Sequence, residues 1–252
     1  MPLLLNLSSR GNAITIKSEK SMTEDYKTGL DFKSTNLDIF LAIITTVGLP
    51  FLCMKLFEMT GALLPILVYY LVFCVGLVKW RKGSLDYCRP QGIVSLIFIA
   101  LLLLQLILFY VSTKIIIPVK NFSLAGFFTN ILIWCPANAF SEQLLWIYIY
   151  DAFAKRFEEK RLKIIFSGMG IIFYFAFIGL IHAFFWGEFM MGFQHTDPYW
   201  QLFIGIHFSI TIGYLMIYRK TKSMYPVAIL HLIGDIGCVL GAGYSILPYL
   251  LK

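Results

Sequence analysis

Seven long apolar runs dominate this chain, and each is close to the ~20 residues that an α-helix needs to cross a bilayer. None of them shows the strict alternation of a lipid-facing barrel strand, so helical spans are the expected solution. The last run is either one long span or two short ones broken near Gly241 and Gly243. We therefore predict an all-α membrane protein, a polytopic helical bundle with seven or eight transmembrane helices. The runs are 37–56, 61–78, 93–119, 127–153, 164–185, 202–218 and 225–250.

The composition excludes a soluble enzyme. Hydrophobic residues make up 59% of the chain and charged residues 14%, against soluble averages of about 45–50% and 25%. The net charge of +7 comes from 21 lysines and arginines that are dispersed between the apolar runs, so we expect no nucleic-acid partner. The five cysteines form neither a CxxC nor a CxH pattern, which predicts no disulfide framework and no cysteine metal site.

The basic residues also predict an orientation, because lysine and arginine are retained on the cytoplasmic side of a membrane. They are frequent in the connections after the second, fourth and sixth runs and scarce in the other connections. We therefore expect a multi-pass protein of the cell membrane with a cytoplasmic amino terminus and membrane lipids as its surroundings. Residues 1–35 lack the apolar core of a signal peptide and are expected to form a polar cytoplasmic tail. Residues 36–252 are expected to form a single transmembrane domain.

Few ionisable side chains fall inside the runs, and each costs roughly 2.5–3.5 kcal/mol at the bilayer centre. Glu142 lies in the fourth run, His182 in the fifth, and His231 and Asp235 in the last. Asn138 precedes Glu142 by four residues, as His231 precedes Asp235, so each pair shares one helix face. A dehydrated glutamate beside an imidazole can take a proton from water, and such a pair of groups is typical of a hydrolase active site.

Three motifs on these runs resemble those of the CPBP (CAAX protease and bacteriocin-processing, or Abi) intramembrane proteases, which include the type II CAAX prenyl proteases. The motifs are EQLLWI at 142–147, IGLIH at 178–182 and HLIGD at 231–235, and PVAIL precedes the last of them. The resemblance covers about 130–236, and we place a CPBP-like core at about 127–250. It implies an intramembrane endopeptidase acting on a membrane-associated peptide or protein, such as a prenylated CAAX-type or leader peptide.

By the same resemblance, Glu142 and His182 would activate the attacking water, while His231 and Asp235 would stabilise or orient the oxyanion end. Three residues depart from the family pattern. Gln143 stands where the family has a second glutamate, Ile147 where it has arginine and Ile178 where it has phenylalanine. Losing both members of a buried Glu–Arg pair can be nearly neutral, whereas losing one leaves an unpaired charge.

Other interpretations stay open at this point. Glu142, or the pair of His231 and Asp235, could serve only as interhelical hydrogen bonds that hold the bundle together. Glu142, His182 and His231 would also make a two-histidine, one-carboxylate zinc set, although we expect a metal-free mechanism without a cofactor. A catalytically weakened immunity or regulatory protein is the main alternative function, and a proton-coupled transporter is a third. His207 is expected to line the site at most, and His195 has no expected role.

Overall fold

The computed structural model describes residues 31–91, 96–117, 122–189, 192–193 and 197–252. These residues form a bundle of helices without a strand, which confirms the predicted all-α fold. Most of the predicted tail 1–35 lies outside the described residues. The helices are α1 (Asn36–Thr60), α2 (Leu63–Leu67), η2 (Val68–Leu77), α3 (Val78–Lys82), α4 (Leu96–Ile115), α5 (Leu124–Thr129), η3 (Asn130–Trp134), α6 (Cys135–Ala154), α7 (Lys160–Phe184), η4 (Trp186–Glu188), α8 (Tyr199–Thr221), α9 (Tyr225–Ala242) and η5 (Leu247–Tyr249).

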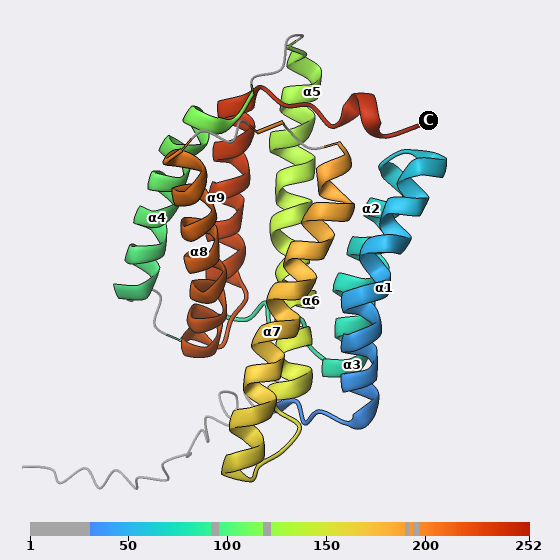
Figure 1. Ribbon diagram of the computed structural model, residues 1–252, viewed down its shortest axis with the longest axis vertical. Helices are drawn as coiled ribbons and strands as arrows, with labels where there is room; N and C mark the ends of the chain where they lie inside the picture. The colour runs from blue at the N-terminus through green and yellow to red at the C-terminus, as the bar shows by residue number, and fades with distance from the viewer. Residues whose placement is uncertain (1–30, 92–95, 118–121, 190–191, 194–196) are drawn as a thin grey trace, which may run out of the picture.

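The centre of the bundle is α6, which continues without a break from α5 and η3 (Figure 1). Most residues of α6 are buried, and the helix packs against α1, η2, α7 and α9. On one side α7, α1 and the α2–η2–α3 helix cover it, and on the other side α9 joins it to α4 and α8. A helix in this position meets protein on almost every face, so it can carry polar side chains that lipid would not tolerate.

Six helices of the described residues are long and apolar enough to cross a membrane. The predicted count of seven or eight crossings is not confirmed. The fourth predicted run, 127–153, falls on the continuous helix α5–η3–α6, which is not among these six; α6 contributes several polar residues to it. The last run forms a single helix, α9, which ends where Gly243 adopts a left-handed conformation with φ 63°. Only the short η5 follows it within the described residues.

Two segments of the bundle are π-helical rather than α-helical, namely η2 and η3. Such segments contain more residues per turn and are often found at functional sites. In η2 the wider turn brings Tyr69 and Tyr70, which are adjacent in sequence, into the buried interior together. Tyr70 donates a hydrogen bond of 2.6 Å to Asn138 of α6, and Tyr69 accepts one of 3.3 Å from Trp146. The π-helix thus attaches the second apolar helix to the polar face of α6.

Described lysines and arginines gather at one end of the bundle, drawn at the bottom of Figure 1 and here called the basic end. This end contains the connections α3–α4, α6–α7 and α8–α9. The opposite end holds only Lys55, Lys114 and Lys252 among the described residues, while Lys120 lies outside them. The basic end is made of Lys33, Lys79, Arg81, Lys82, Arg89, Lys155, Arg156, Lys160, Arg161, Lys163, Arg219, Lys220 and Lys222.

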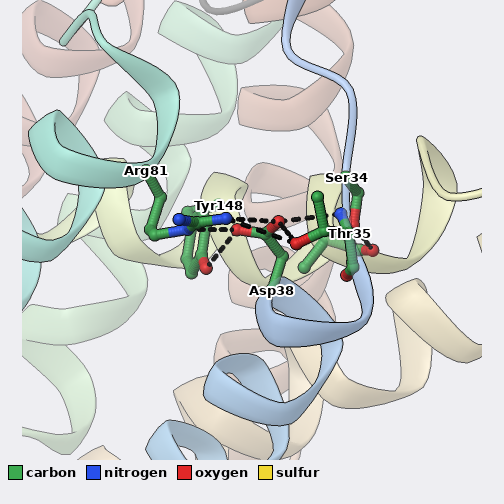
Figure 2. A network of polar contacts seen from close by, with 6 residues as sticks. Ser34, Thr35, Asp38, Arg81 and Tyr148 are labelled. Carbon is green, nitrogen blue, oxygen red and sulfur yellow. Dashed lines mark hydrogen bonds and ion pairs between the residues drawn. The ribbon is translucent and has the colours of Figure 1, made fainter.

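Several of these cations are not free loop charges, because they are paired with buried carboxylates. Figure 2 shows Asp38, fully buried at the start of α1, between Arg81, Tyr148 and Thr35. Arg81 donates to both carboxylate oxygens, at 2.8 and 3.0 Å, and Tyr148 donates at 2.9 Å. This network joins α1, α3 and α6, three helices that are far apart in the sequence.

A second network lies beside the first. Lys82 is buried between Asp86, at 3.6 Å, and Asp151 of α6, at 3.2 Å, and Lys155 approaches Asp151 at 3.3 Å. Tyr218 of α8 donates to Asp86 and also accepts a bond from Lys82. The orientation signal read from the sequence therefore includes residues that fasten the helices to one another at this end.

Removing Asp38 is expected to destabilise the protein strongly, because Arg81 and Tyr148 would lose their shared acceptor. Breaking one member of a buried ion pair costs a few kcal/mol, so Asp38→Ala should lower the free energy of unfolding by about 3 kcal/mol. Denaturant unfolding in detergent micelles measures the change. Glu158→Ala is the matched control, since Glu158 pairs with Lys33 at a fully accessible surface. A similar small loss for both variants would contradict a stabilising role of the Asp38 network.

Lys155 gives the basic end a pH dependence. Burial lowers the pKa of Lys155, and Asp151 offsets this effect only in part. The amine of Lys155 therefore binds its proton more tightly in the unfolded chain than in the folded one. The charged amine destabilises the fold at neutral pH, and this destabilisation decreases as the pH approaches the ordinary lysine pKa. The unfolding free energy of the wild type minus that of Lys155→Met should rise as the pH is raised from neutral to alkaline. A flat difference would contradict this linkage.

Candidate active site

The polar face of α6 carries Asn138, Glu142 and Trp146, spaced four residues apart, so the three side chains stack along one side of the central helix. Facing them on α9 are His231 and Asp235, which are also one turn apart. The two helices run antiparallel, since α6 descends and α9 rises in Figure 1. Antiparallel packing sets Asp235 at the level of Asn138 and His231 nearer to Trp146.

Direct hydrogen bonds link the two helices. Asn138 Nδ2 donates to Asp235 Oδ2 at 3.0 Å and lies 3.5 Å from His231 Nε2. His231 Nε2 is also 3.3 Å from Asp235 Oδ1. The side chains of His231 and Asp235 are each 13% exposed, so this pair is largely withdrawn from the surroundings. The carboxylate of Asp235 therefore lies within ion-pair distance of Nε2 of His231.

His231 keeps its second ring nitrogen available. Nδ1 is buried and has no hydrogen-bond partner among the described residues. When Nε2–H is donated to Asp235, Nδ1 carries a lone pair in the neutral ring and an N–H in the charged ring. A buried nitrogen of this kind can accept a proton or donate a hydrogen bond to a bound group.

Glu142 is almost fully buried, with 1% of the residue exposed. Its Oε1 accepts a hydrogen bond of 2.8 Å from the indole Nε1 of Trp186, which belongs to η4 just beyond α7. Aromatic rings surround this indole, with Tyr69 and Tyr70 of η2 at 6.2 Å and Trp134 at 5.9 Å between ring centroids. The carboxylate thus lies in an apolar, aromatic environment at the middle of the bundle.

His182 is placed differently from the other three predicted residues. It is exposed, and its Nδ1 lies 2.7 Å from the carbonyl oxygen of Ile178 in the preceding turn of α7. Because a carbonyl only accepts, Nδ1 carries the proton, which leaves a lone pair on Nε2 of the neutral ring. His182 packs on one side of Trp146, with 6.2 Å between ring centroids, and His231 packs at 5.6 Å from the same indole.

The structure therefore brings His231 and Asp235 of α9 into direct contact. On α6, which faces them, Glu142 lies one turn from Asn138. His182 approaches these residues through the indole of Trp146. Glu142 has no hydrogen bond to either imidazole within the described chain. Sequence reasoning missed Tyr70, Trp146 and Trp186 as contributors, although Trp146 stands inside the EQLLWI motif. The paired aromatics at 69–70 were a signal that periodicity alone did not distinguish from core residues.

The structure describes the surroundings of the three residues that depart from the CPBP motifs. Gln143 is completely buried, and both atoms of its amide lack a hydrogen-bond partner among the described residues. Ile147 is buried in the core, as an apolar side chain in place of arginine would be. Ile178 contributes its carbonyl oxygen to His182. Positions 143 and 147 thus carry an amide without a described partner and a buried alkyl group.

The zinc alternative does not fit this geometry. Within the described ranges, no group of three or more histidine, cysteine, aspartate or glutamate side chains could hold a metal ion. His207, on α8, is exposed, packs against the ring of Phe203 in a tilted arrangement, and its Nδ1 lies 3.1 Å from the carbonyl oxygen of that residue. His195 lies outside the described residues.

Known proteins offer no guide to this site: the chain matches no family model, no curated protein and no solved structure.

Tyr70→Phe tests whether η2 fixes the polar face of α6. The change removes the donor to Asn138 Oδ1 and leaves a buried acceptor unsatisfied, which typically costs about 1–3 kcal/mol. We expect a lower thermal unfolding midpoint in detergent micelles, with helix content unchanged by circular dichroism. Tyr110→Phe on α4 is the control, because Tyr110 is 55% exposed. Equal midpoints for the two variants would show that the Tyr70 hydrogen bond contributes nothing.

Proposed function

We propose that this protein is an intramembrane endopeptidase of the CPBP type, which hydrolyses a peptide bond of a membrane-associated peptide or protein. The observation that supports it most is the convergence of Asn138 and Glu142 on α6 with His231 and Asp235 on α9 inside an apolar bundle. Four polar side chains at membrane depth are costly unless they are paired or functional. Pairing accounts for Asn138 and Asp235, whereas Glu142 and His231 Nδ1 retain capacity for chemistry.

The roles follow from which atoms are free. In the proposed reaction, water oxygen attacks the carbonyl carbon of the scissile peptide and gives one proton to the Glu142 carboxylate, while His182 Nε2 accepts a hydrogen bond from the other O–H of the water. His231, held by Asp235 through Nε2, donates Nδ1–H to the oxyanion when its ring is charged. Collapse of the tetrahedral intermediate breaks the C–N bond, and the proton taken from water passes to the leaving amine. A carboxylate and a new amino terminus are the products.

The membrane topology of the proposal places the basic end on the cytoplasmic side of the cell membrane, with the amino terminus there as well. The uneven distribution of lysine and arginine between the two ends supports this orientation. Substrates with a hydrophobic anchor, such as a prenylated CAAX-type peptide or a leader peptide, fit a site at this depth.

Glu142→Gln is the sharpest test of catalysis. The glutamine Oε1 can still accept from Trp186, so the fold is expected to persist, but the neutral amide takes no proton from water. Turnover of a fluorogenic prenylated CAAX-type or bacteriocin leader peptide by the protein in vesicles should fall by about 100-fold or more. Thermal unfolding of the same samples shows whether the variant is folded.

Two matched controls accompany this experiment. Glu188→Gln changes an exposed carboxylate in η4 and should leave turnover unchanged. His182→Ala should reduce turnover as Glu142→Gln does, whereas His207→Ala changes another exposed imidazole of the membrane region and should not. Full activity of folded Glu142→Gln would remove Glu142 from the mechanism.

A second candidate function is a catalytically weakened relative that acts as an immunity or regulatory partner. It is favoured by the hydrogen bond from Trp186 to Glu142, which occupies the carboxylate, and by the unpartnered amide of Gln143 where the family has a second acid. In that case the wild-type protein would cleave none of the peptides, and a biological effect such as protection of cells would survive Glu142→Gln.

A further inference from the structure

An apolar groove runs along the outer face of the bundle between α1 and the η2–α3 helix, away from the candidate active site. Its volume is about 420 Å³, within the range of small-molecule binding sites, roughly 300–1,000 Å³. Its only polar lining side chain is the hydroxyl of Thr45, which is buried. The groove is lined by Leu41, Ile44, Thr45, Val72, Phe73, Gly76, Leu77 and Trp80.

The π-helical geometry of η2 contributes to this groove. A Cβ atom on Gly76 would lie 2.9 Å from the carbonyl oxygen of Leu71, five residues earlier, so the wide turn requires glycine here. The same absence of a side chain leaves the wall of the groove open at Gly76, which is exposed. At Gly76 the wall of the groove is therefore formed by backbone and not by a side chain.

The dimensions of the groove fit one hydrocarbon chain of one leaflet. Its wall on the η2–α3 helix extends from Val72 to Trp80, which corresponds to a rise of at most about 12 Å. Half of the hydrocarbon core of a bilayer is about 15 Å deep. The groove thus covers most of the depth of the leaflet next to the basic end, and both α1 and Leu63–Lys82 are apolar enough to stand in that leaflet.

Charge at the mouth of the groove indicates the headgroup. Trp80, which lines the mouth, is 64% exposed, as a ring at headgroup level often is. Lys79, the preceding residue, is exposed, and its Nζ donates a hydrogen bond of 2.9 Å to the neutral carbonyl of Gly83. Within the described chain it forms no ion pair, whereas the neighbouring Arg81 is neutralised by Asp38. A lysine at headgroup level attracts anionic lipids.

We propose that this groove is a binding site for an anionic phospholipid of the leaflet at the basic end, with one acyl chain between α1 and η2 and the phosphate group on Lys79. The site is independent of the proposed peptidase activity, because it shares no residue with the cluster around Glu142. The bound lipid stabilises the packing of α1 and η2 on the outer face of the bundle. On its inner face η2 presents Tyr69 and Tyr70 to α6.

The test uses the full chain in nanodiscs that contain equal amounts of phosphatidylglycerol and phosphatidylcholine, with bound lipids counted by native mass spectrometry after release. The wild type should retain phosphatidylglycerol in preference to phosphatidylcholine. Lys79→Gln should reduce this preference by about fivefold, the change expected from one lysine at the membrane surface. Ile44→Trp should fill the groove and remove the retained lipid of either kind.

Matched controls separate the groove from the general surface. Lys220→Gln removes an exposed lysine of the same basic end on α8, and Ile165→Trp changes a residue on α7 that is 50% exposed, as Ile44 is. Both should retain phosphatidylglycerol as the wild type does. The proposal is overturned if the control variants lose as much lipid as the groove variants. It is also overturned if the wild type retains both lipids equally, or if a second copy of the chain occupies the groove and crosslinks through it.

Discussion

The architecture depends on one constraint, that polar groups inside a hydrocarbon layer must find partners within the protein. The central helix α6 contains too many polar residues to be counted with the six apolar helices. It is stable at the centre because α1, η2, α7 and α9 cover it, and because Tyr70 of η2 and Trp186 of η4 supply partners for Asn138 and Glu142. The surrounding helices thus supply the hydrogen-bond partners that lipid could not give to the polar residues of α6.

The sequence predicted the features that depend on composition and local spacing. The apolar runs correspond to the helices, the all-α fold is confirmed, and the shared faces of Asn138 with Glu142 and of His231 with Asp235 follow from helical periodicity. What the sequence did not reveal depends on contacts between distant segments. Arg81 and Lys82 looked like loop charges because Asp38 and Asp151 lie 43 and 69 residues away from them.

The candidate site was predicted with similar limits. Its residues were identified because ionisable side chains are energetically costly inside a membrane. The hydrogen bond from Trp186 to Glu142 could not be anticipated, because it depends on the 3₁₀ turn η4, where the backbone leaves the α-helical conformation of α7. The indole of Trp146 between His182 and His231 is likewise a product of three-helix packing. Whether the site acts as a peptidase or as a binding partner depends on how Glu142 divides its interactions between the indole and a bound substrate. Both functions use the same fold.

The position of Tyr70 in the chain has a consequence for biogenesis. Asn138 leaves the ribosome 97 residues before Asp235, an interval of about 5–20 seconds at ordinary rates of synthesis. During that interval α9 does not yet exist, whereas η2 has already been made. The tyrosine hydroxyl can therefore hold the amide of the nascent helix in advance, so that the last hairpin docks onto a surface already organised to receive it.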